Sequence, residues 1–228
     1  MMIAELSNIT KTYRTSPEAP EQRVLTGLNL AIAAGATLSI SGPSGCGKST
    51  VLNLLGTLDQ PDAGIVKLFG EEVPYGNEIA LSDLRAEKLG FIFQLHHLLP
   101  QCTALENVLI PTLGGSRRPD AGEAADRAKR LLNRVVLGAL MDKKPAQLSG
   151  GERQRVAVVR ALIRAPGLIL ADEPTGALDA ASASLLIDLL LDLNKEEGPA
   201  LVLVTHDPAL AGRMAQKYRL TEGGLSLG

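Results

Sequence analysis

Residues 42–49, with the sequence GPSGCGKS, have the glycine spacing and the Lys-Ser ending of a phosphate-binding loop. Glycines let consecutive backbone N–H groups converge on phosphate oxygens, and the helix expected after the loop adds the positive end of its dipole. We expect Lys48 to contact the β- and γ-phosphates and the Ser49 hydroxyl to bind Mg²⁺. The loop indicates a nucleoside triphosphate ligand, and by itself it leaves kinase, GTPase and ATPase activities open. The residues expected to contact the nucleotide here are Ser44, Gly45, Cys46, Gly47, Lys48, Ser49 and Thr50.

Two acidic residues follow an apolar run that is typical of a buried strand. Residues 168–171 (LILA) lead directly into Asp172 and Glu173, and open α/β sheets bind their ligands at the carboxyl ends of strands. Asp172 is suited to the Mg²⁺ shell, and Glu173 would then stand beside the γ-phosphate, where a carboxylate can polarise an attacking water. A strand that ends in two solvated acids before Pro174 would give the same pattern, but the phosphate loop favours the site.

Two further polar residues follow predicted strands in the same way. Gln94 comes directly after residues 90–93, and His206 comes directly after residues 200–205. At the ligand edge of the sheet, both side chains could contact the γ-phosphate, its Mg²⁺ or the attacking water. Each is a weak signal alone, because a single Gln there is usually a loop residue and a single His is usually a surface side chain.

A second glycine loop, residues 148–152 (LSGGE), precedes another predicted helix and so forms a second anion-binding helix N-terminus. Ser149 is a natural cap and a hydroxyl donor in this loop, with Gly150 and Gly151 behind it. One γ-phosphate does not need two such loops from one chain. Two chains that face each other head to tail would use both, because each could supply Ser149 to a nucleotide held by the other's Lys48.

These residues need a scaffold that brings the ends of several strands to one edge. Short β-rich runs alternate with amphipathic helical stretches, which is typical of a parallel sheet with crossover helices. The predicted fold class is therefore α/β, a phosphate-loop NTPase core with a mixed sheet. Strands are predicted at 37–41, 168–171 and 201–204, a helix at 49–58, and two further strands, in an antiparallel portion, at 65–69 and 90–93.

The middle of the chain has a different periodicity. Over residues 120–136 and 152–164 the apolar residues recur at three- and four-residue spacing, which predicts helices. We therefore expect a single domain over residues 1–228, with an α-helical subdomain inserted into the α/β core at about residues 95–164.

Composition excludes several classes of protein. The 228 residues carry 23 Lys and Arg against 25 Asp and Glu, and without a basic block a protein dedicated to nucleic acid is not expected. No run of 18 uncharged apolar residues occurs, and the N-terminus lacks the pattern of a signal peptide. Cys46 and Cys102 form no disulfide framework, so we expect a soluble cytoplasmic protein, with a reactive thiol at Cys46 near Lys48.

The sequence resembles the ATP-binding subunits of ABC transporters over essentially its whole length. The motifs occur in family order: the phosphate loop, Gln94, LSGGE at 148–152, LADE at 170–173, ALD at 177–179 and His206. The resemblance implies a two-lobed fold, with ATP and Mg²⁺ as ligands and closure of two copies of the chain around two ATP molecules. None of these motifs departs from the family pattern, so we expect an active ATPase.

The resemblance also implies roles for individual residues. Tyr13 occupies the place of the aromatic residue that stacks on adenine, and Asp179 would contact the phosphate loop of the opposing subunit. Gln94 would sense the γ-phosphate and couple to the membrane partner. Glu173 would be the catalytic base, and His206 would position the γ-phosphate.

Several stretches resemble the branch of the family that contains macrolide-efflux, lipoprotein-release, haem-export and cell-division ATPases. They are residues 90–94, 103–108, 172–179 and 205–208. This branch implies export or mechanical extraction by separate membrane permease subunits, with the ATPase held on the cytoplasmic face of the membrane. A solute importer and a cell-division-type regulatory ATPase remain alternatives. A soluble ABC ATPase acting on DNA or ribosomes is disfavoured, because the chain has neither a long coiled-coil insert nor tandem cassettes.

The permease should dock in the helical insert just after Gln94. The candidates for an exposed apolar patch there are Leu95, Leu98, Leu99, Leu105 and Val108. The same residues could instead form the core of the insert. Metal binding by His96 and His97 is not expected, because adjacent histidines rarely converge on one ion without further ligands.

Overall fold

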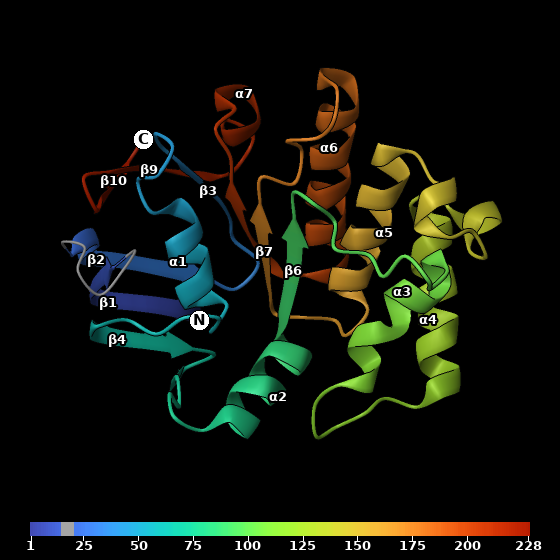
Figure 1. Cartoon of the computed structure of the whole chain (residues 1–228), viewed down its shortest axis with the longest axis horizontal. Coiled ribbons are helices and arrows are strands. Elements are labelled where there is room, and N and C mark those ends of the chain that lie inside the picture. The colour runs from blue at the N-terminus through green and yellow to red at the C-terminus, as the bar shows by residue number, and fades with distance from the viewer. Residues whose placement is uncertain (15–20) are drawn as a thin grey trace.

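The computed structural model describes residues 1–14 and 21–228, whose strands form two sheets (Figure 1). The six-stranded sheet has the order β10-β9-β3-β8-β7-β6, and the four-stranded sheet has the order β2-β1-β4-β5. The strands are β1 (Met2–Tyr13), β2 (Gln22–Ala33), β3 (Thr37–Ser41), β4 (Ala63–Leu68), β5 (Glu71–Glu72), β6 (Leu89–Phe93), β7 (Leu168–Asp172), β8 (Ala200–Val204), β9 (Gln216–Thr221) and β10 (Gly224–Leu227). The α-helices are α1 (Lys48–Leu55), α2 (Glu78–Lys88), α3 (Ala104–Leu109), α4 (Ala121–Arg134), α5 (Gly150–Leu162), α6 (Ala180–Glu197) and α7 (Pro208–Ala211).

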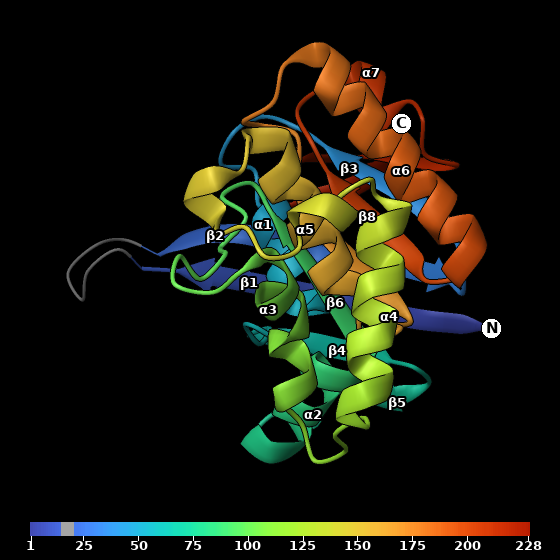
Figure 2. The ribbon, with the colours of Figure 1, turned by 90° about the vertical axis from the view of Figure 1, so that its right-hand side faces the viewer.

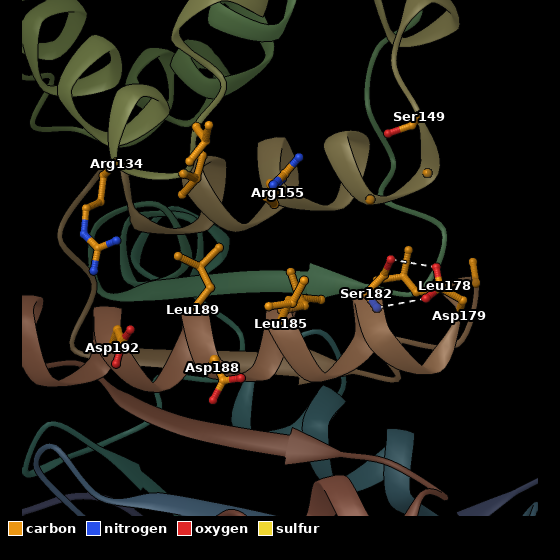
Figure 3. A pocket seen from close by; sticks show the side chains of 16 residues that line it. Arg134, Ser149, Arg155, Leu178, Asp179, Ser182, Leu185, Asp188, Leu189 and Asp192 are labelled. Carbon is orange, nitrogen blue, oxygen red and sulfur yellow. Dashed lines mark hydrogen bonds between the residues drawn. The ribbon is translucent and has the colours of Figure 1, made fainter.

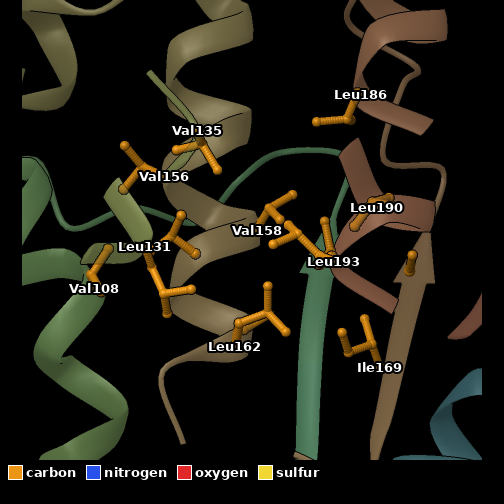
Figure 4. Close-up of a cluster of buried hydrophobic side chains, with 14 of the residues drawn as sticks. Val108, Leu131, Val135, Val156, Val158, Leu162, Ile169, Leu186, Leu190 and Leu193 are labelled. Carbon is orange, nitrogen blue, oxygen red and sulfur yellow. The ribbon is translucent and has the colours of Figure 1, made fainter. Parts of the chain in front are cut away.

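The strands β3, β8, β7 and β6 run parallel to one another in the six-stranded sheet. Successive side chains of a strand point to opposite faces, so a strand that is buried on both faces must be apolar throughout. β7 shows this directly. Leu168 and Leu170 face a core that also contains α1 and the four-stranded sheet, whereas Ile169 and Ala171 face a core formed with α5 and α6. Figure 4 shows part of this second core.

The prediction of an antiparallel portion is correct for one of its two strands and wrong for the other. β4 pairs antiparallel with β1 in the four-stranded sheet. β6 instead pairs parallel with β7, with Leu89 opposite Leu168 and Phe93 opposite Asp172. The physical reason is the connection, because the long helical segment between β6 and β7 carries the chain back to the same end of the sheet, as a parallel crossover requires.

Between β6 and β7 the chain forms α3, α4, α5 and three short 3₁₀ turns, Ile110–Leu113, Gly138–Leu140 and Pro145–Gln147. Helix α4 begins at the side-chain cap Asp120 and buries Ala128 and Leu132 against its neighbours. Figure 2 shows α3 and α4 side by side on this face of the molecule. Helix α5 contacts α3, α4 and β6, so it packs against both the helical layer and the sheet. In the described parts of the chain, no helix combines the length and the apolar character needed to cross a bilayer.

The contact of α5 with β6 requires a glycine at position 90. A Cβ atom at Gly90 would lie 2.5 Å from the carbonyl oxygen of Ala161, which is a backbone atom of α5. The sheet and the helix can therefore approach this closely only without a side chain at that position.

We expect Gly90→Ala to lower the free energy of unfolding by about 2 kcal/mol, because the backbone of α5 must move away from β6. Urea denaturation followed by circular dichroism measures this change. Gly224→Ala is the matched control, since its Cβ would meet nothing closer than the carbonyl oxygen of Thr221 at 3.7 Å. Equal stability of the two variants would contradict the close packing.

Candidate functional site

The phosphate-binding loop connects β3 to α1 and lines a cavity of about 480 Å³ at the carboxyl ends of the strands. The lining includes eight residues that the sequence singled out around the loop and the acidic strand end, together with the predicted aromatic residue: Tyr13, Ser44, Gly45, Gly47, Lys48, Ser49, Thr50, Asp172 and Glu173. The ammonium group of Lys48 donates hydrogen bonds to the carbonyl oxygens of Gly42 at 3.0 Å and Pro43 at 2.8 Å. These bonds hold the lysine folded back over the loop, at the place where phosphate oxygens would compete for it.

Two glycines of the loop have backbone conformations that other residues rarely adopt. Gly45 has φ +76° and would carry a Cβ into open space, so its backbone can approach a ligand closely. Gly47 is the N-cap of α1 with φ +104°, and a Cβ there would lie 2.7 Å from Cγ1 of Val24 on β2. The spacing of glycines in the sequence thus has a direct conformational reason at both positions.

The acidic pair at the end of β7 occupies two different environments. Burial raises the pKa of Asp172, and the Ser49 hydroxyl and the nearby charge of Lys48 oppose that increase. Glu173 has φ +45°, in the left-handed region, where a residue other than glycine costs about 1–3 kcal/mol. Its backbone N–H donates to the carbonyl oxygen of Val204 on β8, which fixes this strained position.

His206 lies beside Glu173. The Nδ1 atom of His206 is 2.9 Å from Oε2 of Glu173, and most of the histidine side chain is exposed. A carboxylate oxygen can only accept, so we assign the proton of this hydrogen bond to Nδ1. The structure therefore brings together two residues that are 33 positions apart in the sequence, because β7 and β8 are parallel neighbours.

The donor set at Ser49 and Asp172 fits Mg²⁺. Magnesium prefers hard oxygen ligands, keeps several waters and is usually held in phosphate-binding sites by one or two protein oxygens together with the phosphates. A hydroxyl next to a half-buried carboxylate is such a set. Over residues 1–14 and 21–228 no group of three or more His, Cys, Asp and Glu side chains is placed to hold a metal by itself.

Tyr13 lies at the end of β1 and forms part of the wall of the cavity. Its hydroxyl donates to Oδ2 of Asp59 at 2.7 Å, and the ammonium group of Lys11 lies 5.1 Å from the centre of its ring. Burial raises the pKa of the Tyr13 hydroxyl, and the hydrogen bond to Asp59 adds to this. The ring is therefore held at the cavity from its polar end, which leaves ring surface for a ligand.

Three residues predicted for the nucleotide site do not line this cavity: Gln94, Cys46 and His206, which reaches it only through its contact with Glu173. Gln94 follows β6 and its amide lies against Gly176, where a Cβ would be 2.6 Å from Nε2 of Gln94. The side chain of Cys46 packs against the core around the four-stranded sheet, and its Sγ would be 2.9 Å from a Cβ at Gly42. The sequence motif does not show which side chains of the loop face the cavity, so it could not predict that the Cys46 thiol points away from it.

The second glycine loop lies in a different place. Ser149, Gly150, Gly151 and Asp179 line a groove of about 590 Å³ between α5 and α6, none of which belongs to the first cavity (Figure 3). Ser149 caps α5: its hydroxyl accepts from the N–H of Glu152 at 3.3 Å, while the Glu152 carboxylate accepts from the N–H of Ser149 at 2.6 Å. The proton of the Ser149 hydroxyl therefore remains free to donate.

Asp179 caps α6 in the same manner. Its carboxylate accepts from the backbone N–H of Ser182 at 3.0 Å and from the Ser182 hydroxyl at 2.6 Å. These hydrogen bonds lower the pKa of Asp179 and keep the carboxylate ionised in the lining of the groove.

A feature that sequence reasoning missed links the two places. Gln154 of α5 is fully buried, and its Nε2 donates to the carbonyl oxygen of Phe93 at 3.2 Å, while its Oε1 accepts from Nδ1 of His96. Arg160, two turns further along α5, donates to the carbonyl oxygens of His96 and His97, both at 2.6 Å. Helix α5, which is capped by Ser149, therefore holds residues 93–97, the segment that contains Gln94, through side-chain hydrogen bonds. In the sequence, the only sign of this contact is that Gln154 is a polar residue on the apolar face of a predicted helix.

The expected apolar patch after Gln94 is divided between surface and core. Leu95 and Leu99 are exposed at 71% and 42%, as expected for a docking surface. Val108 is fully buried, and Leu98 and Leu105 pack against the core formed by α3, α4 and α5. The alternative, that these residues form the core of the insert, is therefore correct for Val108, whereas Leu98 and Leu105 are only partly buried.

Comparisons with known proteins agree with this geometry. Residues 25–176 match the model of the family described as ABC transporter. The chain is 49% identical over 223 residues to the lipoprotein-releasing system ATP-binding protein LolD of Pseudomonas fluorescens, which covers 98% of this chain and 96% of that relative. It is 48% identical to the protein of that name from Legionella pneumophila, strain Paris, over 98% and 97% of the two chains. A dimeric structure of MJ0796, a bacterial ABC transporter cassette, superimposes with a TM-score of 0.88 at 41% identity, over 98% and 97% of the two chains.

We expect Gln154→Ala to loosen the segment 93–97 on α5, because the variant removes the two hydrogen bonds that Gln154 forms with that segment and leaves only those of Arg160. Amide hydrogen exchange should become about tenfold faster at His96 and His97, while exchange in α1 stays unchanged. Gln101→Ala, at an exposed turn, is the matched control. Unchanged exchange over 93–97 in Gln154→Ala would show that Arg160 alone holds the segment.

Proposed function

Since the chain belongs to the ABC transporter family, we propose that it uses ATP hydrolysis to drive a membrane complex that extracts lipoproteins from a bilayer. The support for the substrate class is that relatives 48–49% identical over nearly their whole length are named as lipoprotein-releasing ATP-binding proteins. The observation that supports ATP chemistry is the cavity lined by Lys48, Asp172 and Glu173, with His206 hydrogen-bonded to Glu173. ATP binding and hydrolysis are the activities of this family.

ATP binds in the cavity at the carboxyl ends of the strands. The triphosphate displaces the Gly42 and Pro43 carbonyl oxygens from Lys48, whose ammonium group then neutralises the β- and γ-phosphates. The backbone N–H groups of the loop from Gly45 to Thr50 surround the phosphates, and the adenine stacks on Tyr13.

Mg²⁺, when bound, neutralises the charge of the β- and γ-phosphate oxygens. Ser49 would hold the ion directly, and Asp172 would hold it either directly or through water. The raised pKa of Asp172 fits this role, since burial leaves its carboxylate short of compensating charge. The amide of Gln94 lies against Gly176 in this structure. It would have to move away from Gly176 to contact Mg²⁺ and the γ-phosphate, and this movement would make Gln94 a sensor of the γ-phosphate.

Glu173 is the general base. Its carboxylate accepts a proton from the water that attacks the γ-phosphate. The Nδ1–H of His206 holds the carboxylate through Oε2, and Nε2 of the imidazole would donate to the γ-phosphate when it too carries a proton. The left-handed backbone conformation of Glu173 places this residue in the wall of the cavity. The hydrogen bond from its N–H to Val204 stabilises that strained conformation.

The active unit is a head-to-tail dimer of this chain. The groove with Ser149, Gly150, Gly151 and Asp179 is separate from the cavity with Lys48 in one chain, and a second copy of the chain would join the two around ATP. The free hydroxyl proton of Ser149 then donates to the γ-phosphate, and Asp179 contacts the phosphate loop of the opposing copy. Both solved structures of MJ0796 are described as dimeric, which supports this arrangement.

The membrane permease docks next to residues 93–97. A cavity of about 260 Å³ between α2, β6, the 3₁₀ turn after α3 and α5 is lined by Phe91, Phe93 and Pro111, and Leu95 and Leu99 are exposed nearby in the sequence. An apolar segment of the permease would bury these side chains. The chain would thus be peripheral on the cytoplasmic face of the membrane, held there by its permease.

Glu173→Gln should lower the turnover of ATP at least about a hundredfold and leave ATP binding intact, because the amide keeps the contacts but cannot accept the proton. It should also trap a dimer in ATP and Mg²⁺. Measurement of phosphate release, with light scattering for the mass, checks both. Glu71→Gln, on the exposed strand β5, is the matched control and should behave as the wild type.

Ser149→Arg in the Glu173→Gln background separates binding from closure. The double variant should bind ATP with the affinity of the single variant and stay monomeric, because the new side chain occupies the place of the opposing γ-phosphate. A double variant that still dimerises with ATP would be inconsistent with the shared site.

The role in the membrane is tested by purifying Glu173→Gln from solubilised membranes with ATP and Mg²⁺. We expect it to bring down a permease of four membrane-spanning helices per subunit with a large extracytoplasmic domain, and the reconstituted complex should release lipoproteins. A many-helix permease with a solute-binding protein would make the chain an importer ATPase. A four-helix permease that moves nothing would make it a regulatory ATPase, and the absence of any membrane partner would refute the proposal.

A further inference from the structure

A cavity of about 700 Å³ lies at the edge of the sheet opposite the phosphate-binding loop. Its lining includes Lys88 and Gly167, which immediately precede β6 and β7, so it is located at the amino ends of these parallel strands. Since β7 has five residues, roughly 15 Å of strand separates the cavity from Asp172. The cavity shares no lining residue with the nucleotide cavity or with the groove at Ser149.

The lining of this cavity is strongly basic in a chain whose net charge is −2. It contains five basic residues and two acidic residues: Lys88, Arg117, Arg118, Arg127 and Arg164, with Glu87 and Glu123. Basic residues are thus concentrated here against the charge of the whole protein, which favours an anionic ligand.

Arg164, just after α5, is the buried member of this set. Its side chain is only 10% exposed, and its Nη1 is buried without a hydrogen-bond partner in the described parts of the chain. Its Nη2 donates to the carbonyl oxygen of Arg117 at 2.6 Å, and the carboxylate of Glu87 is 3.9 Å away. A buried guanidinium nitrogen without an acceptor is unfavourable, and an anion in the cavity would satisfy it.

The loop before α4 supplies two further arginines. Among the residues that the structure describes, the exposed side chains of Arg117 and Arg118 form no hydrogen bond and no ion pair, so both are free for a ligand. Arg127 is already used, because it forms an ion pair with Glu197 and donates to the carbonyl oxygens of Leu162 and Ile163. Glu87 is also partly satisfied, since it accepts from the N–H of Arg117 at 3.2 Å.

One wall of the cavity is apolar. The ring of Phe69 lies against Gly167, where a Cβ would be 2.5 Å from a ring carbon. The ammonium group of Lys88 lies 5.6 Å from the centre of the same ring, which fixes its position. Ile163 and Ala165 also line this wall, so an organic part of a ligand could pack here while its charged group faces the arginines.

We propose that this cavity binds a small phosphorylated molecule, with its phosphoryl group on Arg164, Arg117 and Arg118. Guanidinium groups match the oxygen geometry of phosphate, and a doubly charged phosphoryl group balances the excess of positive charge better than a single carboxylate does. The phosphoryl group can belong to a free metabolite or to the headgroup of a lipid. Both have the same chemistry at the arginines.

The first test titrates pyrophosphate into Lys48→Ala by calorimetry, so that the phosphate-binding loop does not contribute. At about 0.15 M salt, saturable binding is expected. Adding Arg117→Ala and Arg118→Ala should weaken it at least about tenfold, and the matched control Arg130→Ala, on the exposed face of α4, should leave it unchanged. Arg164→Lys keeps the positive charge but removes the planar guanidinium group with its paired N–H donors, so it should also weaken binding.

The second arm measures sedimentation of the same variants with vesicles containing phosphatidic acid, and with phosphatidylcholine vesicles as the reference. Binding to the anionic vesicles that is lost in the arginine variants assigns the site to a lipid headgroup, and loss confined to pyrophosphate assigns it to a free metabolite. Thermal unfolding at the wild-type temperature shows that the variants are folded. No binding in either arm, or binding that the variants share with Arg130→Ala, would overturn the proposal.

Discussion

The parallel pairing of β3, β8, β7 and β6 is the constraint on which the rest of the molecule depends. Parallel strands must all end at one edge, so whatever follows each strand meets there even when the residues are far apart in sequence. The phosphate-binding loop follows β3, the acidic pair closes β7, and His206 comes shortly after β8. The strands can lie parallel only because helices cover both faces of the sheet, and this is the reason that β7 divides its side chains between two cores. The chemistry at the edge and the packing beneath it are therefore consequences of one topology.

Helix α5 has a second organising role, because it takes part in three separate functions. Its first residues form the Ser149 loop, its apolar face packs on β6 through the space left by Gly90, and its polar residues hold residues 93–97. Two glycine-rich loops therefore have different purposes. One follows a strand and would face a nucleotide in its own chain, whereas the other begins a helix whose contacts lead toward the surface that would meet the membrane partner.

Most of the residues that line the candidate site could be predicted from sequence, because phosphate binding requires particular residue types at fixed short spacing. Ser44 to Thr50, Asp172 and Glu173 are such residues, and the apolar runs before them specify strands. What sequence could not supply depends on long-range contacts. The left-handed backbone of Glu173 depends on Val204, and the burial of Gln154 depends on a segment about 60 residues away. The parallel pairing of β6 was missed for the same reason, since a short apolar run looks alike in either type of sheet. Helical periodicity likewise could not tell the exposed Leu95 from the buried Val108.

The two attachment points on α5 have a mechanical consequence. Gln154 and Arg160 are six residues apart, so they contact residues 93–97 at positions about 9 Å apart along a rigid rod. A single attachment would let the segment follow the helix only in position. Two attachments also fix the orientation of the segment relative to the helix. A tilt of α5 that begins at Ser149 would therefore rotate residues 93–97 together with the helix. Closure of the dimer at the Ser149 groove would thus move the segment 93–97 by a rigid-body rotation of α5.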